Sequence, residues 1–354
     1  MQKVSNISSV HIELTDKCQA QCPMCARNYH GGKNREFIKN GDISFKQFKQ
    51  WFPKKFLSQL SNFYSCGNYG DPAFARDCLE IFEYVRECNS ETRLAIHTNG
   101  GMRNREWWKK LATVLGKNSE VVFAVDGFKG KHELYRKNTK FDKVIENLKA
   151  FMSTGGVARV DSLVFKHNEA DVEELKKFLR DLGVQHINFF STQRFYEMKK
   201  FEVHNNTGEI EYYLEPAEFD RFKKSPFTEL NKLVDEDYRN SLVEAAVIDP
   251  KCMTENEIYV DPYGNILPCC WIGGEYIEQP IRETLPIHYL RNLSVSITKN
   301  MLSDIGVPNC NDGVLYTDQN LFERLDDYWQ GKDKCLMCAR QCSSMIYDLK
   351  SKYD

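Results

Sequence analysis

The first half of the chain alternates short strand-like runs with helical patterns, and this alternation constrains the fold most. The strand-like runs are rich in Val, Ile, Phe and Tyr, and they span 10–15, 61–66, 93–98, 120–125, 158–165 and 186–191. Between them, apolar residues recur at helical steps in 78–88, 105–115, 141–152 and 170–183. Such alternation builds a parallel sheet whose functional loops follow the carboxyl ends of the strands. We therefore predict an α/β fold with a partial (β/α)6 TIM-like barrel over residues 1–195.

Composition narrows the classes of partner. The 354 residues include 48 Lys and Arg against 50 Asp and Glu, so no basic field supports binding to nucleic acid. No stretch approaches the roughly 18 to 20 apolar residues that span a bilayer, and the first residues lack a basic-then-apolar signal peptide. We expect a cytoplasmic protein without a membrane partner.

Thirteen cysteines are clustered along the chain, three within residues 18–25 and seven after residue 250. A chain of this length without an export signal does not need disulfides, so clustered thiols indicate metal. Cys18, Cys22 and Cys25 directly follow the first predicted strand. Three protein ligands leave one coordination position open, and the spacings differ from the runs of four cysteines that ligate a cluster fully. An external ligand is therefore expected.

The loop resembles the Cys-x3-Cys-x-Φ-Cys signature of the radical S-adenosylmethionine (SAM) enzymes, with Met24 in the Φ position. The resemblance implies that three thiolates hold a 4Fe-4S cluster whose fourth iron binds the amino and carboxylate groups of SAM. In that family, reduction cleaves SAM to methionine and a 5′-deoxyadenosyl radical. The resemblance also implies a flavodoxin- or ferredoxin-type reductant.

Later turns extend the resemblance. Gly70 and Asp71 stand at the Gly-Glu positions of the family's Gly-Gly-Glu-Pro turn, and Asn99 follows the third strand-like run. Asp126 follows the fourth, and Arg136 resembles an arginine that pairs with the SAM carboxylate. The resemblance implies cofactor contacts for Met24, Gly70, Asp71, Asn99, Asp126 and Arg136. As alternatives, Asp126 could cap the next helix and Arg136 could form a surface ion pair.

A second set of cysteines lies near the C-terminus. Cys252 and Cys269 flank a predicted hairpin, and Cys335, Cys338 and Cys342 follow at short spacings. The set resembles the SPASM and twitch extensions of radical SAM enzymes, which bind auxiliary 4Fe-4S clusters. Because Cys342 follows Cys338 after three residues, where a SPASM domain has five, the twitch form is favoured.

In the twitch form, one auxiliary cluster would be held by Cys252, Cys269, Cys335 and Cys338, with Cys342 as the alternative ligand. Spacing alone does not separate iron–sulfur from a structural zinc site. Cys270 is a candidate catalytic acid or base, because some SPASM enzymes place an acid at this position. The predicted domains are the barrel over 1–195, a helical bridge over 196–250, and a small cysteine-rich twitch/SPASM-type domain over 251–354.

The predicted function is radical SAM chemistry, in which hydrogen is abstracted from a small molecule or from a peptide or protein. One alternative resembles the molybdenum-cofactor GTP cyclase, although the chain does not end in the Gly-Gly pair expected there. Another alternative is a noncatalytic, zinc-stabilised binding protein. The sequence does not name the substrate, the fate of its radical or the oligomeric state.

Overall fold

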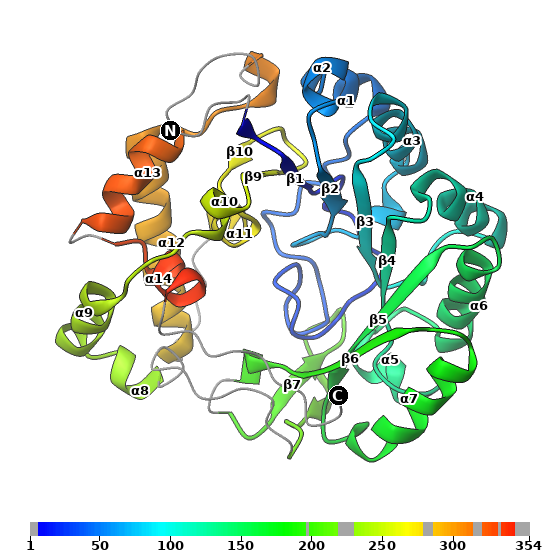
Figure 1. Ribbon diagram of the computed structural model, residues 1–354. Helices are drawn as coiled ribbons and strands as arrows, with labels where there is room; N and C mark the ends of the chain where they lie inside the picture. The colour runs from blue at the N-terminus through cyan, green and yellow to red at the C-terminus, as the bar shows by residue number, and fades with distance from the viewer. Residues whose placement is uncertain are drawn as a thin grey trace. The chain divides into compact units, whose positions relative to one another are not determined.

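The computed structural model describes residues 6–195, 198–218, 230–278, 286–313, 321–331 and 334–343 (Figure 1). The chain forms two compact units. Among the described residues, 12–218 belong to the first, which we call the β/α unit. Residues 6–11 and 230–343 belong to the second, which we call the cysteine-rich unit.

Parallel strands form the sheet of the β/α unit and confirm the α/β prediction. The strands follow one another in chain order: β2 (Asn62–Ser65), β3 (Arg93–Thr98), β4 (Glu120–Ala124), β5 (Val157–Val164) and β6 (His186–Ser191). The first strand of the chain, β1 (Ser9–Ile12), has only Ile12 in this unit. Each neighbouring pair from β2 to β6 is parallel. The loops that follow these strands therefore meet at one edge of the sheet.

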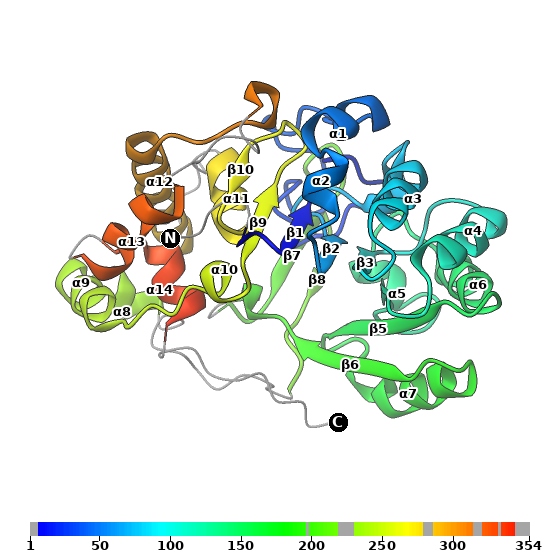
Figure 2. The ribbon, with the colours of Figure 1, turned by 45° about the horizontal axis from the view of Figure 1, so that its top comes forward.

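Amphipathic helices connect the strands and cover the outer side of the sheet (Figures 1 and 2). Three occupy the ranges expected from periodicity: α3 (Cys78–Cys88), α4 (Arg105–Leu115) and α6 (Phe141–Met152). The fourth, α7 (Val172–Asp181), follows a single 3-10 turn, Glu169–Asp171. Shorter helices are α1 (Phe45–Trp51), α2 (Lys54–Leu57) and α5 (His132–Tyr135). Trp108 of α4 and Phe151 of α6 are buried against Phe123 of β4.

The segment expected to be a helical bridge begins instead with a β-hairpin. Strands β7 (Phe201–His204) and β8 (Ile210–Leu214) pair antiparallel, and they belong to the β/α unit. Val203 and Leu214 are buried while the residues beside them are more exposed, which is the alternation of a strand with one covered face. Farther along, α8 (Leu230–Leu233) and α9 (Glu236–Ala245) are helical and lie in the cysteine-rich unit.

The cysteine-rich unit contains the hairpin predicted between Cys252 and Cys269. Strands β9 (Glu257–Val260) and β10 (Ile266–Leu267) pair antiparallel around a turn in which Asp261 accepts hydrogen bonds from the backbone N–H groups of Tyr263 and Asn265. The described helices are α10 (Lys251–Thr254), α11 (Cys270–Ile277), α12 (Pro286–Ile305), α13 (Leu321–Gln330) and α14 (Leu336–Cys342). In the described parts of the chain, no helix combines the length and apolar character needed to cross a membrane.

Residues 9–11 of β1 also belong to this unit. The Ser9 hydroxyl donates to Glu257 Oε2 at 2.8 Å, and the backbone N–H of Ser8 donates to the carbonyl of Asn256 at 3.1 Å. Residues at opposite ends of the sequence therefore share one compact unit.

Candidate functional site

Three thiols lie on one loop that follows β1. The backbone N–H of Cys25 donates to the carbonyl of Cys22 at 3.0 Å, which closes a tight turn between the last two thiols. The N–H of Gln21 donates to the carbonyl of Lys137 at 3.0 Å and holds the middle of the loop. Cys22 is buried, whereas Cys18 and Cys25 are partly exposed. The structure thus places the predicted ligands Cys18, Cys22 and Cys25 together at the predicted edge of the sheet.

Two side-chain N–H groups approach these sulfurs. Asn99 Nδ2 lies 3.5 Å from Cys18 Sγ, and Arg136 Nη1 lies 3.8 Å from Cys22 Sγ. Burial raises the pKa of the Cys22 thiol to about 11, and burial followed by the charge of Asp71 raises the pKa of Cys18. N–H donors stabilise a thiolate and tune the potential of a cluster that it ligates. Binding iron here would release the thiol protons.

Asp71 holds Asn99 in place beside Cys18. Asp71 Oδ2 accepts from the backbone N–H of Asn99 at 2.7 Å and from its side-chain Nδ2 at 2.6 Å. Asp71 Oδ1 accepts from the hydroxyl of Thr98 at 2.8 Å and from the N–H of Ala73 at 2.9 Å. Burial raises the pKa of Asp71 above its ordinary value. The predicted cofactor residues Asp71 and Asn99 therefore form one hydrogen-bonded pair.

Gly70 lies where two backbones touch. A Cβ atom built at Gly70 would lie 1.7 Å from the carbonyl oxygen of Thr15, so only glycine fits. Glu13 Oε1 accepts from the backbone N–H groups of Tyr69 and Gly70 at 2.7 and 2.8 Å. The glycine is thus required by the close approach of the turn after β2 to the chain after β1.

Asp126 and Arg136 form a buried ion pair. Arg136 Nε donates to Asp126 Oδ2 at 2.5 Å, and the backbone N–H of Leu163 donates to Asp126 Oδ1 at 2.6 Å. Asp126 is completely buried, and the Arg136 side chain is 19% exposed. Burial by itself would lower the pKa of Arg136, but Asp126 and Cys22 raise it. Asp126 therefore positions a cation beside Cys22, and the surface ion pair and helix cap considered as alternatives are both wrong.

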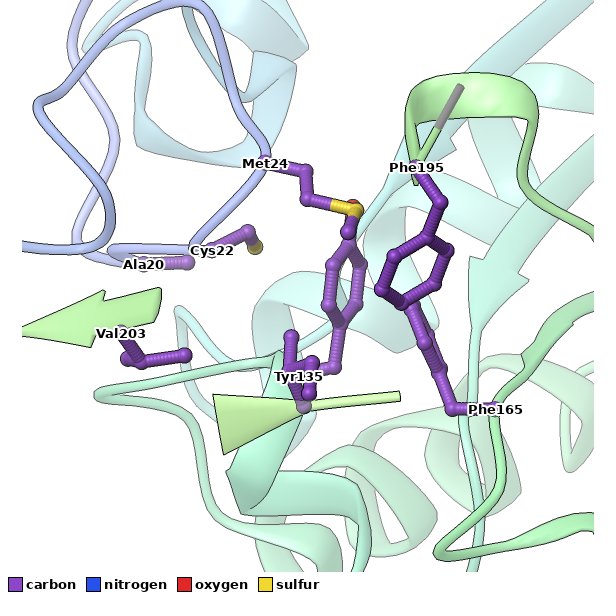
Figure 3. Packing of buried hydrophobic residues seen from close by; sticks show 8 residues of the cluster. Ala20, Cys22, Met24, Tyr135, Phe165, Phe195 and Val203 are labelled. Atoms are coloured by element: carbon purple, nitrogen blue, oxygen red, sulfur yellow. The ribbon is translucent and has the colours of Figure 1, made fainter. Parts of the chain in front are cut away.

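Met24 lies in a buried apolar cluster beside the thiol loop (Figure 3). Its side chain points toward the rings of Tyr135 and Phe195, and Phe165 packs in the same cluster. The carbonyl of Met24 accepts from Arg194 Nη1 at 2.7 Å. The packing anchors the loop between Cys22 and Cys25. A contact of Met24 with SAM stays a prediction.

Two residues of this network were missed from the sequence. Gln19 Nε2 donates to Asn99 Oδ1 at 2.6 Å, so Asn99 is held from both sides. Glu13, which directly follows β1 and stands in the predicted strand-like run 10–15, is almost fully buried. An acidic residue in an otherwise apolar strand was the available signal for Glu13, since a buried carboxylate needs partners. Gln19 carries no comparable signal.

Five thiols gather in the cysteine-rich unit. Burial is the largest cause of the raised pKa of Cys252, and the charges of Cys269 and Cys342 raise it further. The charge of Cys269 also contributes to the raised pKa of Cys338. Cys335 and Cys338 share a hydrogen bond that lowers the pKa of Cys335 and raises that of Cys338. The predicted ligands Cys252, Cys269, Cys335 and Cys338 and the alternative Cys342 are therefore neighbours.

Hydrogen-bond donors also approach these sulfurs. Trp329 Nε1 lies 3.4 Å from Cys338 Sγ, and the hydroxyl of Thr298 lies 3.9 Å from Cys335 Sγ. Backbone N–H groups at the start of α11 lower the pKa of Cys269, although burial raises it overall. Sulfurs that receive N–H donors inside an apolar shell have the chemistry of cluster ligands.

The remaining cysteines lie outside these sets. Cys270 is the first residue of α11, directly beside Cys269, and its catalytic role stays a prediction. Burial raises the pKa of Cys310 and of Cys66 to about 12. None of the thirteen cysteines, all of which lie in the described residues, forms a disulfide.

Comparison with known proteins finds a family match within the β/α unit. Residues 12–182 match the family model described as the radical SAM superfamily. Over 183 residues the chain is 26% identical to the probable GTP 3′,8-cyclase of Methanocaldococcus jannaschii, and the match covers 50% of this chain and 56% of that protein.

Solved structures show a more distant likeness. Streptococcus suis SuiB bound to S-adenosylmethionine is 14% identical with a TM-score of 0.48, and the match covers 78% of this chain and 62% of SuiB. A structure of anSMEcpe with bound AdoMet is 17% identical with a TM-score of 0.47, covering 82% of this chain and 83% of that one. Likeness at this level does not extend to function.

The family match and the geometry of the thiol loop agree. The matched segment contains Cys18, Cys22 and Cys25 together with Asp71, Asn99, Asp126 and Arg136. A domain of this family implies SAM and a 4Fe-4S cluster. Residues 12–182 therefore match a radical SAM domain, and this match supports an enzyme.

Proposed function

We propose that this protein reductively cleaves SAM at a 4Fe-4S cluster held by Cys18, Cys22 and Cys25, and that it abstracts hydrogen from a small molecule or from a peptide or protein. One observation carries the proposal: three thiols share one loop, and two of their sulfurs receive N–H groups, from Asn99 at 3.5 Å and from Arg136 at 3.8 Å. When bound, the cluster would supply the electron that cleaves SAM to methionine and a 5′-deoxyadenosyl radical.

The chain's own residues would prepare this site. Asn99 donates toward the sulfur of Cys18 and is oriented by Asp71 and by Gln19. Arg136 brings positive charge to Cys22 and is oriented by Asp126. A fixed cation near a cluster favours the reduced, more negative state. These contacts support a site that is organised before SAM arrives.

The second thiol set supports an auxiliary cluster. We assign it to Cys252, Cys269, Cys335 and Cys338, with Cys342 as the alternative ligand. Four thiolates saturate the cluster, so its roles would be electron transfer and stabilisation of the cysteine-rich unit. The competing assignment is a structural zinc site in a binding protein.

SAM cleavage tests the proposal. Anaerobic, iron-loaded protein given dithionite and SAM should form 5′-deoxyadenosine slowly without substrate. The Cys18→Ala/Cys22→Ala/Cys25→Ala variant should form none and should hold about four iron atoms, against about eight in the wild type. Cys88→Ala, at the end of α3, is the matched control and should behave as the wild type. Retention of all iron in the triple variant would contradict the assignment.

The match to a probable GTP 3′,8-cyclase favours GTP as a second candidate substrate. GTP should then increase 5′-deoxyadenosine formation and be consumed with it, whereas ATP should not. If GTP leaves the rate of 5′-deoxyadenosine formation unchanged, the candidate substrates are other small molecules, peptides and proteins. A flavodoxin or ferredoxin would be the reductant in either case.

A further inference from the structure

The loop after Cys25 meets β7 through three side chains that have the chemistry of metal ligands. His30, Glu202 and His204 each offer one ligand atom, and these atoms all lie within 4.8 Å of one another. The two histidines are partly buried and Glu202 is exposed. Two imidazole nitrogens with one carboxylate oxygen suit zinc and other divalent transition metals.

Strand alternation separates this group from the thiol loop. Glu202 and His204 are two residues apart on β7, so their side chains share one face of the strand. Val203, between them, is fully buried in the cluster that contains Cys22 and Met24 (Figure 3). The candidate ligands therefore lie on the face of β7 opposite to the one that packs against the thiol loop.

Backbone contacts hold the ligands before any ion binds. The backbone N–H of His204 donates to the carbonyl of His30 at 2.9 Å, and His30 Nδ1 lies 3.2 Å from the carbonyl of Glu202. If Nδ1 carries the proton and donates to this carbonyl, the lone pair is on Nε2. A histidine that binds metal commonly donates its other N–H to a carbonyl in this way.

The conformation of His30 fixes its ring between two neighbouring rings. Its φ of 53° lies in the left-handed region, which costs a residue other than glycine roughly 1–2 kcal/mol. Its ring stacks on the rings of Phe201 and His204, with centroids 4.7 Å apart in both pairs. Strain held by surrounding contacts is typical of ligand-binding positions.

We propose that His30, Glu202 and His204 bind one divalent transition-metal ion, with Zn²⁺ as the probe, and that this ion clamps the β7–β8 hairpin to the loop after Cys25. Three protein ligands leave the remaining position to water. Because the other face of β7 covers the thiol loop, the ion would stiffen the wall beside Cys22 without touching the cluster.

An ordinary ion pair is the competing explanation. His204 Nε2 lies 3.3 Å from Glu202 Oε2, and a partly exposed pair of this kind contributes less than about 1 kcal/mol. The nearby cation Lys137 is occupied by Glu211 at 2.5 Å and by the carbonyl of His204 at 2.8 Å. The two explanations differ in whether added zinc binds.

Zinc binding to the iron-loaded protein decides between them. Anaerobic protein without SAM is dialysed against buffered Zn²⁺, and zinc and iron are counted in the same samples. Wild type should take up one zinc at unchanged iron, and His204→Gln and Glu202→Gln should bind it at least about tenfold more weakly. His186→Gln, an exposed histidine on β6, is the matched control and should retain the zinc.

Hydrogen exchange provides the second readout. Zinc should slow amide exchange across residues 201–214 in the wild type and in His186→Gln, but not in His204→Gln. Equal zinc uptake by the wild type and His204→Gln, or uptake matched by loss of iron, would overturn the proposal. Because SAM cleavage is not measured, failure here leaves the proposed function untouched.

Discussion

Arg136 Nη1 lies 3.8 Å from the sulfur of Cys22 while the same guanidinium is bound through Nε to the buried carboxylate of Asp126. The cation therefore has two partners, one of which is a proposed cluster ligand. Stability and redox potential should depend on this one side chain in different ways.

Arg136→Met should act on both properties. It leaves the Asp126 carboxylate buried without its cation, which costs about 3–5 kcal/mol, and Asp126→Asn added to it should recover part of the loss. Loss of positive charge beside Cys22 should make the cluster potential more negative. Urea unfolding and an EPR-monitored redox titration measure the two effects. Arg159→Met, which breaks a partly exposed pair with Asp161, should leave the potential unchanged.

Gly70→Ala should lower the free energy of unfolding strongly, although it adds only one methyl group. The new Cβ would lie 1.7 Å from the Thr15 carbonyl, so the chain after β1 must move away from the turn after β2. Gly130→Ala is the matched control: its φ is +86°, and a Cβ there meets nothing within 4 Å. The control should lose roughly 1–2 kcal/mol from strain alone. Equal urea midpoints for the two variants would show that the contact is easily relieved.

The ligand set of the auxiliary cluster can be assigned by counting iron. Cys269→Ala and Cys338→Ala should each lower the content from about eight iron atoms to about four, whereas Cys342→Ala should keep about eight. Cys310→Ala, which removes a buried thiol outside the set, is the control. Cys269→Ala should also expose the chain after about residue 250 to limited proteolysis, because the cluster supplies folding free energy. Loss of iron in Cys342→Ala would reassign the fourth ligand.

His132 should make the β/α unit sensitive to acid. Burial lowers the pKa of its imidazole, and the backbone N–H of Asp126 donates to Nδ1 at 3.1 Å. His132 therefore binds a proton more readily in the unfolded chain than in the folded one. Its contribution to the free energy of unfolding is present above pH 6.5 and is lost as the pH falls toward the lowered pKa of the folded state.

The variant His132→Asn keeps an acceptor but does not titrate. Its urea midpoint should fall less between pH 7.5 and 5.5 than that of the wild type. Part of the pH dependence of the urea midpoint should remain in this variant, because burial also lowers the pKa values of His97 and His167. His186→Asn serves as the exposed control. Identical slopes for the wild type and His132→Asn would remove His132 from the acid response.

Periodicity predicted the regular elements of the first half well. Helices α3, α4 and α6 begin and end where the apolar spacing does, because each buries one face against the sheet. The β7–β8 hairpin was missed because its strands are short and charged, so their alternation was interpreted as a helical pattern. The turn residues from Asn205 to Gly208 between the two runs were the signal that would have found it.

The site could be predicted only as far as motifs reach. The thiols of the loop were found because their spacing is diagnostic, but the contacts that orient Asn99 and Arg136 connect loops from different strands. Glu13 and Gln19 contribute through hydrogen bonds to residues more than 50 positions away, and spacing along one sequence does not encode such partners.

The hydrogen bond from Ser9 to Glu257 spans 248 positions, and this bears on how the chain is made. As the chain leaves the ribosome, residues 18–25 emerge with a complete set of three thiols more than 200 residues before residue 257. Until residue 257 has been synthesised, the strand before them has no partner from β9. Until then its edge is a template for pairing with other chains. Fragments that end before β9 should therefore aggregate, although their iron-binding loop is intact. Soluble expression of such a fragment should require another segment that covers the exposed edge of β1.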